Sequence, residues 1–191
     1  VILYTIDYVP NRFGNPFLNF LYRYFDRACL RKCKVIWNVS DRIIEAREKY
    51  ERVSREDSVA QITVPLGIWY DRIPKVPLAE RDNNTLVFLG TVLEKQGLEI
   101  VIKALPVIFQ KIPEVKFILI GEGPYLASLK KLAKKNRSDK YIDFMGFVES
   151  HEEVEKILSR GTLGIATYKP DPGSFTYFAD PGKIKNYLGA G

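Results

Sequence analysis

The amino-acid sequence predicts an α/β protein whose parallel sheets carry helices on both faces. Short apolar runs of strand length alternate along the chain with longer segments in which apolar residues recur at helical spacing. The strand candidates are almost wholly apolar, as in Lys116–Ile120 (K-F-I-L-I), which is typical of strands buried on both faces. Parallel strands need a crossover between them, and the alternation provides a helix for each crossover.

The first part of the chain predicts three strands and two helices. Phe17, Leu21, Tyr24 and Phe25 recur at the spacing of one helix face, and Ser40 is a suitable N-cap for the next helix. In chain order, we expect a strand at 1–8, a helix at 16–32, a strand at 34–38, a helix at 41–51 and a strand at 61–64.

A Pro-interrupted stretch separates this part from a more regular second part. Pro74 and Pro77 lie in it and it ends in an Asp-Asn-Asn run, so it is the best candidate for a linker. We therefore predict a first domain at 1–74, a linker at 75–84 and a second domain at 85–191. After the linker we expect strands at 85–89, 116–120, 141–145 and 162–168, and helices at 97–112, 125–135 and from 151 onward.

The composition narrows the classes of partner. A formal net charge of +6 suits phosphate-bearing ligands, an anionic membrane surface or nucleic acid. No recognition motif supports nucleic acid, and we expect no nucleic-acid partner. His151, Cys29 and Cys33 do not form a zinc-binding pattern, so we expect no metal and no cofactor. Two free thiols fit a reducing compartment, and no apolar run reaches the roughly 18 residues of a membrane span.

The segment near the end of the chain predicts a turn that leads into a helix and could hold an anion. Asp180 is a good N-cap, and Pro181 suits the first helical position. Gly182 lets another group approach the backbone, and Lys183 adds a positive charge where free helical N–H groups already favour anions. This combination predicts a diphosphate site.

The loops that should surround a ligand follow from the fold class. In open parallel sheets, ligands bind beyond the carboxyl ends of the strands. The loops at that edge are expected at 90–97, 121–124, 146–150 and 168–183.

Four segments of the second part show a recognisable order and spacing: F-L-G-T-V-L-E-K-Q-G-L-E-I-V-I-K-A-L, then I-L-I-G-E-G-P-Y, then F-M-G-F-V, and finally D-P-G-K-I-K-N-Y-L-G-A-G. Together they resemble the C-terminal domain of GT-B glycosyltransferases of family four, the glycosyl transferases group 1. Val64–Ile68 is similar to the segment before that family's interdomain linker. The resemblance implies two Rossmann-like domains, both incomplete, with the acceptor side first and the donor side second.

The resemblance also implies an activity. A sugar would move from a nucleotide-diphosphate sugar to a saccharide or lipid-linked acceptor, with retention, with no dedicated general base and no cofactor besides this co-substrate. It implies a role in polysaccharide biosynthesis and a cytoplasmic location. The basic aromatic helix from Phe17 to Lys34 adds the alternative of peripheral contact with the cytoplasmic face of a membrane. A catalytically degenerate nucleotide-sugar binding module is the alternative function.

The resemblance assigns roles residue by residue. Lys95 and Lys183 would stabilise the leaving group. The chain departs from the family at Thr91 and Gln96, where an Arg and a Lys are usual, and at Asn186, where a Glu is usual. These departures motivate the degenerate alternative. The donor-binding residues implied are Gly90, Thr91, Gln96, Gly121, Gly123, Phe147, Val148, Asp180, Pro181, Gly182 and Asn186.

Several of these residues have simple structural alternatives. Lys95 could be an exposed lysine at a helix start, and Asp180 could act only as an N-cap. Gly121 could serve only a turn, and Phe147 could be a core residue.

Overall fold

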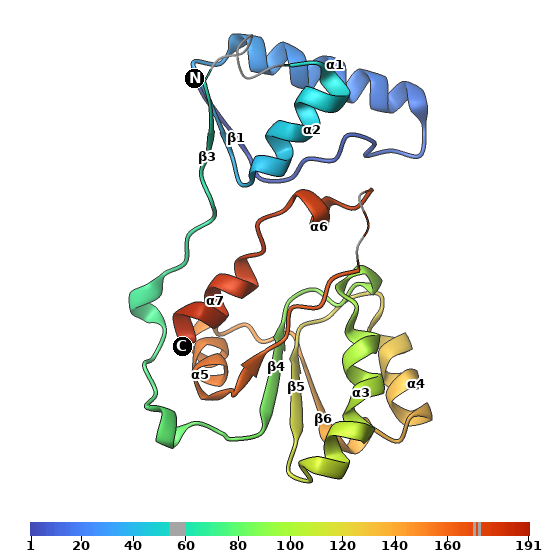
Figure 1. Cartoon of the computed structure of the whole chain (residues 1–191), viewed down its shortest axis with the longest axis vertical. Coiled ribbons are helices and arrows are strands. Elements are labelled where there is room, and N and C mark those ends of the chain that lie inside the picture. The colour runs from blue at the N-terminus through green and yellow to red at the C-terminus, as the bar shows by residue number, and fades with distance from the viewer. Residues whose placement is uncertain (54–59, 170, 172) are drawn as a thin grey trace. The chain divides into compact units, whose positions relative to one another are not determined.

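The computed structural model describes residues 1–53, 60–169, 171 and 173–191. They form two compact units: Val1–Leu66 with Pro170–Pro181, and Gly67–Lys169 with Gly182–Gly191 (Figure 1). These bounds differ from the sequence-based division at 1–74, 75–84 and 85–191. The segment around Ile73 belongs to the second unit because that side chain packs against the C-terminal helix, and Phe178 returns to the core of the first unit.

The first unit contains a parallel sheet with strand order β1-β2-β3. The first strand ends at Thr5, three residues before its predicted end at Tyr8. Ser40 precedes the second helix as predicted, but its hydroxyl donates to the carbonyl oxygen of Phe178 at 2.5 Å and makes no cap hydrogen bond. The elements of this unit are β1 Ile2–Thr5, α1 Pro16–Lys32, β2 Val35–Asn38, α2 Asp41–Glu51, β3 Gln61–Thr63 and α6 Phe175–Phe178.

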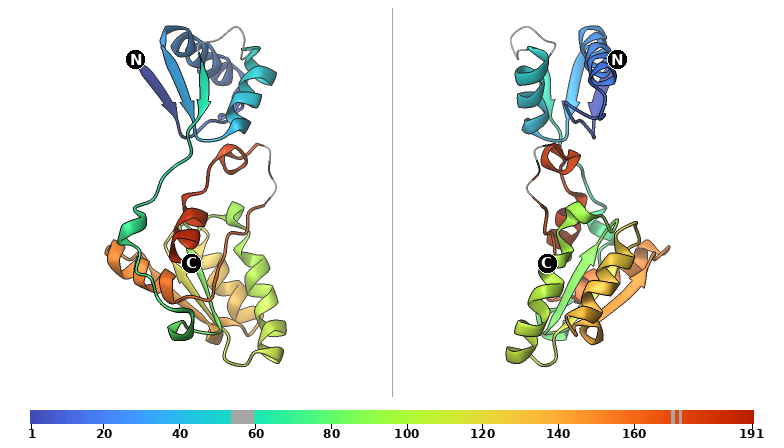
Figure 2. Two further views of the ribbon diagram at one scale, coloured as in Figure 1. Left: turned by 60° about the vertical axis from the view of Figure 1, so that its left-hand side comes forward. Right: turned by 90° about the vertical axis from the view of Figure 1, so that its right-hand side faces the viewer.

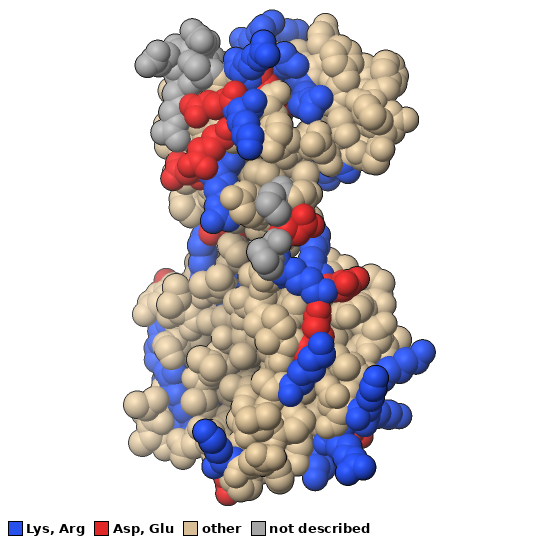
Figure 3. Space-filling view, turned by 45° about the vertical axis from the view of Figure 1, so that its right-hand side comes forward, with Lys and Arg blue, Asp and Glu red and all other residues tan. Residues whose placement is uncertain are grey.

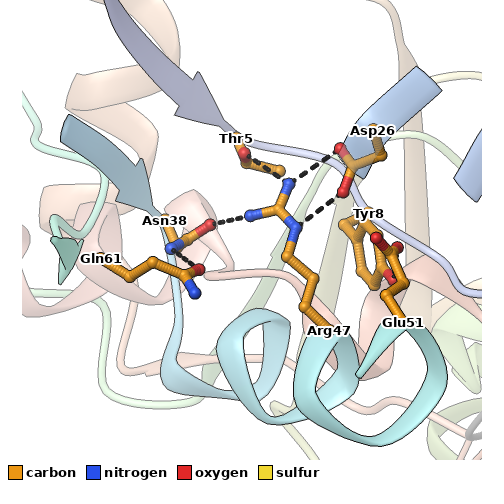
Figure 4. A network of polar contacts seen from close by, with 7 residues as sticks. All are labelled: Thr5, Tyr8, Asp26, Asn38, Arg47, Glu51 and Gln61. Atoms are coloured by element: carbon orange, nitrogen blue, oxygen red, sulfur yellow. Dashed lines mark hydrogen bonds and ion pairs between the residues drawn. The ribbon is translucent and has the colours of Figure 1, made fainter. Parts of the chain in front are cut away.

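A buried arginine joins the strands and helices of the first unit (Figure 4). Arg47 on α2 is fully buried. Its Nε and Nη2 donate to the two carboxylate oxygens of Asp26 on α1, at 2.8 and 3.0 Å. It also donates to Asn38 Oδ1 at 2.7 Å and to Thr5 Oγ1 at 3.1 Å, the side chains that end β2 and β1. Each acceptor lies on a different element, so one guanidinium fixes their mutual positions.

Beside the guanidinium lies a buried acid. The hydroxyl of Tyr8 donates to Glu51 Oε1 at 2.5 Å, and Glu51 is 2% exposed. Burial raises the pKa of Glu51 to about 7; Tyr8 opposes this shift through its hydrogen bond, and Arg47 opposes it through its charge. Burial also raises the pKa of Tyr8 above its usual range, so Tyr8 remains a donor.

The second unit contains a parallel sheet with strand order β6-β5-β4-β7. The strands β4 and β5 have the predicted bounds, whereas β7 covers only Leu163–Gly164 of the expected 162–168. The strands are β4 Thr85–Leu89, β5 Lys116–Ile120, β6 Ile142–Gly146 and β7 Leu163–Gly164. The α-helices are α3 Leu98–Lys111, α4 Leu126–Lys135, α5 His151–Arg160 and α7 Gly182–Ala190, and the 3₁₀ turns are η1 Tyr70–Arg72, η2 Leu78–Glu80, η3 Glu94–Gln96 and η4 Asp139–Tyr141.

Helices cover both faces of this second sheet, as the fold class predicted. Figures 1 and 2 show α3 and α4 on one face and α5 and α7 on the other. Neighbouring strand residues point to opposite cores: Phe88 and Leu119 pack with α3 and α4, whereas Val87 and Ile120 pack with α5 and α7. This alternation explains why the strands are apolar throughout.

Candidate functional site

The carboxyl ends of β4, β5 and β6 meet at one edge of the second sheet. The loops that leave them pack backbone to backbone: Gly121 N–H donates to Gly146 O at 2.7 Å, and Gly90 N–H donates to Ile120 O at 3.0 Å. A Cβ on Gly121 would overlap the carbonyl oxygen of Gly90, and the φ of Gly121 is +131°. Gly121 is therefore required for the packing of the loops.

A cavity of about 400 Å³ opens at this edge. Its volume lies within the range that small-molecule ligands occupy. Six residues that the sequence marked as donor-binding line it, namely Gly90, Thr91, Gly121, Phe147, Val148 and Asn186. Phe147 is 71% exposed, so it is not a core residue. The other lining residues are Leu89, Ile120, Glu122, Glu149, His151 and Val154.

Three polar lining residues were not predicted as ligands. Glu122 lies between Gly121 and Gly123 in the loop after β5. Its position in a loop expected to surround the ligand could have indicated it as a lining residue. Glu149 and His151 lie where β6 leads into α5. The cavity therefore has a more acidic rim than the motifs indicated.

Lys183 lies in the first turn of α7, beside the loop after β4. Its Nζ donates to Gln96 Oε1 at 2.7 Å and lies 4.1 Å from the ring centroid of Phe88. A side chain at position 90 would meet this Nζ at 3.2 Å from its Cβ. Burial lowers the pKa of Lys183 to about 8. No carboxylate within the described part of the chain forms an ion pair with Lys183, so the half-buried ammonium is held by a neutral amide and an aromatic face.

Gln96 is held in place by the segment that follows β7. Its carbonyl oxygen accepts the hydroxyl of Thr167 at 2.8 Å. Two residues farther on, Lys169 Nζ forms ion pairs with Glu94 at 3.0 Å and with Glu99 at 2.6 Å. The hydrogen bonds that Lys169 donates to Glu99 and Glu94 raise its pKa, so this link persists across the neutral range. The loop that meets Lys183 is thus tied to the segment after β7.

Lys95 and Gly123, two of the predicted site residues, do not line the cavity. Lys95 is half-buried in η3, and its carbonyl oxygen accepts the backbone N–H of Lys169 at 3.0 Å. Gly123 packs against the backbone of Val92, where a Cβ would overlap the carbonyl oxygen. The structure therefore brings Gln96 into contact with Lys183. The leaving-group role of Lys95 stays a prediction.

The Asp-Pro-Gly-Lys turn is divided between the two units. Asp180 and Pro181 belong to the first unit, where Asp180 Oδ2 accepts the backbone N–H of Leu66 at 2.7 Å. The helix α7 begins at Gly182, one residue after the predicted start, and a Cβ there would meet nothing within 4 Å. Pro170 and Pro172 of the expected ligand loop lie outside the described residues.

Metal clusters and membrane-spanning helices are absent from the described part of the molecule. Over the residues the structure describes, no three His, Cys, Asp or Glu side chains are grouped so as to hold a metal ion. Within the same ranges, no helix has the length and apolar character needed to cross a bilayer.

Comparison with known proteins identifies the family. A profile described as glycosyl transferases group 1 matches residues 70–168, just over half of the 191 residues. The chain belongs to the glycosyl transferases group 1 family. The matched region runs from η1 past β7 and contains nearly all of the cavity, while Lys183 and Asn186 lie beyond it.

Similar curated proteins act on phosphatidylinositol compounds, according to their names. One phosphatidylinositol N-acetylglucosaminyltransferase component from Homo sapiens is 25% identical over 91 residues, and the gpi3 subunit of the Schizosaccharomyces pombe enzyme is 26% identical over 90 residues. A GDP-mannose-dependent alpha-(1-6)-phosphatidylinositol monomannoside mannosyltransferase from Mycobacterium tuberculosis is 28% identical over 98 residues. The matches cover 48%, 47% and 47% of this chain but only 19%, 20% and 26% of the relatives.

Solved structures with the same fold are GT-B glycosyltransferases. WaaG, a glycosyltransferase involved in lipopolysaccharide biosynthesis, superposes with a TM-score of 0.70 at 16% identity, covering 99% of this chain and 54% of that one. The pneumococcal O-GlcNAc transferase GtfA, in complex with UDP and GlcNAc, gives 0.65 at 16% identity and covers 100% and 35%. The chain thus spans about half the length of the first of these, and the predicted fold of Rossmann-like units is confirmed.

Proposed function

We propose that this chain provides the donor-binding part of a glycosyltransferase that uses a nucleotide-diphosphate sugar. The observation that carries the proposal is Lys183, an ammonium withdrawn from water without a carboxylate partner among the described residues. Its Nζ lies against Gly90, and Gly90 also lines the cavity. An ammonium buried in this way binds an anion more strongly than a solvated one does.

The leaving group of the proposed reaction is a nucleoside diphosphate, so negative charge develops on its phosphate oxygens. Lys183 and the free N–H groups at the start of α7 would stabilise that charge. The cavity lined by Thr91, Phe147 and Asn186 would hold the remainder of the donor. Asn186 can donate to or accept from a ribose hydroxyl without the added strength of a charge. Retention, and a leaving-group role for Lys95, rest on the family resemblance.

The relatives' names support a lipid-linked or saccharide acceptor and a sugar such as mannose or N-acetylglucosamine. A role in polysaccharide biosynthesis and a location on the cytoplasmic side rest on the family resemblance.

The surface of α1 supports contact with an anionic membrane. Phe17, Phe20, Tyr24 and Phe25 are each more than half exposed on this helix. Arg23 and other basic residues lie beside them, and in Figure 3 blue side chains adjoin an uncharged area on the upper unit. Aromatic residues flanked by cations are typical of interfacial helices.

Vesicle sedimentation tests this membrane contact. The protein should sediment with vesicles that contain phosphatidylinositol and not with pure phosphatidylcholine. Phe20→Ser with Phe25→Ser should abolish sedimentation while leaving nucleotide binding unchanged. Equal sedimentation of wild type and variant would refute the contact.

Kinetics of the intact protein test the proposed function. Lys183→Ala should raise the donor KM or lower kcat at least tenfold, which corresponds to about 1.4 kcal/mol. Lys134→Ala, at an exposed position on α4, is the matched control and should change neither constant. Unchanged kinetics of Lys183→Ala would refute the diphosphate role.

The degenerate alternative makes a different prediction. A binding module without activity would be stabilised by nucleoside diphosphates yet release no nucleotide from any donor. A donor present at 100 times its Kd should stabilise the fold by about 2.7 kcal/mol in either case. Sugar transfer by the intact protein would exclude the alternative.

A further inference from the structure

The strands β4 and β7 begin as a regular parallel ladder and then separate. Leu86 pairs with Leu163 and Val87 with Gly164, and the N–H of Ile165 donates to Val87 O at 2.8 Å. In a parallel ladder the next hydrogen bond would join the N–H of Leu89 to the carbonyl oxygen of Ile165.

The hydroxyl of Tyr187 takes the place of that hydrogen bond. It accepts the N–H of Leu89 at 3.0 Å and donates to the carbonyl oxygen of Ile165 at 3.0 Å. A phenol can do both because it carries one donor and acceptor lone pairs. Two hydrogen bonds in series now span the gap that one would have closed, so the strands are held apart. This accounts for the end of β7 at Gly164, where the sequence predicts a longer strand.

The surroundings of Tyr187 are shaped for this insertion. Gly164 has no side chain, and a Cβ there would overlap the ring of Tyr187. Burial raises the pKa of Tyr187 to about 12, so the hydroxyl keeps its proton at neutral pH. Its donor and its acceptor are both main-chain groups, which do not titrate.

Tyr187 and Lys183 lie four residues apart on α7 and therefore on the same face of the helix. The hydroxyl bridge fixes how α7 is rotated and how deeply it lies against the sheet. With that position fixed, Lys183 lies over Phe88, against Gly90 and within hydrogen-bonding distance of Gln96.

We propose that Tyr187 is a positioning residue for the donor site: its hydroxyl replaces one hydrogen bond of the sheet, separates β4 from β7 and holds Lys183 against Gly90. The inference rests on the proposed function, because the ammonium it positions is the group assigned to the diphosphate.

Tyr187→Phe removes the hydroxyl and keeps the ring. In titrations of the full chain with UDP and with GDP, this variant should weaken binding of whichever nucleotide the wild type binds by about tenfold. Tyr125→Phe is the matched control, since it removes the hydroxyl of a half-buried tyrosine on the α4 side of the sheet. It should leave the affinity unchanged.

A double-mutant cycle separates positioning from general stability. If Tyr187 acts through Lys183, then Tyr187→Phe should change the affinity less than about twofold in a Lys183→Ala background. An equal loss in both backgrounds would overturn the inference, because a merely structural role weakens binding whether or not Lys183 is present.

The cycle also distinguishes the two proposals. If Lys183→Ala binds as tightly as the wild type, the proposed function fails and this inference fails with it. If Lys183→Ala loses affinity while Tyr187→Phe keeps it, only this inference fails. Should Tyr187→Phe not fold, Gly164→Ala displaces the ring with the hydroxyl retained, and the same tenfold loss, absent in the Lys183→Ala background, is expected.

Discussion

Arg47 in the first unit and Lys183 in the second are both withdrawn from solvent, but their surroundings differ. Arg47 is fully buried and donates to the carboxylate of Asp26 and to two further side-chain oxygens. Lys183 donates to the amide oxygen of Gln96 and otherwise faces aromatic rings. One cation has its charge balanced by the protein, and the other has not.

The difference separates a structural cation from one suited to a ligand. A planar guanidinium with a bidentate carboxylate is already satisfied, so a ligand would gain little by approaching it. A desolvated ammonium near a cavity is unfavourable until an anion arrives, and burial accordingly lowers its pKa. Substitutions at the two positions should therefore have opposite consequences for stability and for binding.

The largest expected effect is on the stability of the first unit. Arg47→Met should destabilise it by about 3–5 kcal/mol, because Asp26 and the polar groups on β1 and β2 lose their partner in a buried setting. Urea unfolding followed by Trp37 fluorescence, in a Trp69→Phe background, measures the loss. Lys183→Met is the comparison and should change stability by less than about 1 kcal/mol.

A second variant decides whether the ion pair itself is responsible. Combining Arg47→Met with Asp26→Leu removes both charges and should restore most of the lost stability. If the double variant is no more stable than Arg47→Met, the interpretation of Asp26 as the stranded charge is wrong.

The next effect is on binding. Since the pKa of Lys183 is lowered to about 8, the ammonium is mostly protonated well below that pH and is lost progressively as the pH rises through it. The affinity for UDP or GDP should be constant from about pH 7 to about pH 8 and then fall by up to tenfold per pH unit, about 1.4 kcal/mol. Calorimetric titrations across this range provide the measurement. Lys183→Arg keeps its charge and should remove the dependence, and a wild-type affinity that stays constant to about pH 9.5 would contradict the assignment.

The fold could be predicted from sequence where local pattern decides the structure. The bounds of β4, β5, α1 and α2 follow from apolar runs and helical spacing, which depend on neighbouring residues alone. The end of β7 could not be predicted from the local pattern, because it depends on the hydroxyl of Tyr187, more than twenty residues away. The bounds of the two compact units differ from the predicted division for a similar reason, since Ile73 and Phe178 pack onto elements that are distant in sequence.

The candidate site shows the same limit. Motifs indicated Gly90 and Asn186, and the structure places both at the cavity. The hydrogen bond from Lys183 to Gln96 joins residues 87 positions apart, so spacing could not reveal it. The burial of Arg47 could not be predicted from the sequence of its own helix, because its partner Asp26 lies on another helix. Contacts of this kind depend on tertiary packing, which residue patterns do not encode locally.

The smallest expected effect is on the pH dependence of stability and concerns Glu51, a buried acid in the first unit. Tyr8, Asp26, Arg47 and Arg27 act on its carboxylate, and burial raises its pKa from 4.5 to about 7. Between these two values the folded chain keeps a proton that the unfolded chain has released. Stability should therefore fall as the pH rises from about 4.5 to about 7, with a slope below about 1.4 kcal/mol per pH unit.

Glu51→Gln isolates this contribution because the amide oxygen can still accept the hydrogen bond from Tyr8 and does not titrate. Urea unfolding at several pH values should show a shallower decline for the variant than for the wild type over this window. Equal slopes would mean that Glu51 titrates normally in the folded state. In that case Arg47 and Arg27 would balance the charge of the Glu51 carboxylate as fully as Asp26 balances the charge of Arg47. Both buried charges of the first unit would then be paired within the protein.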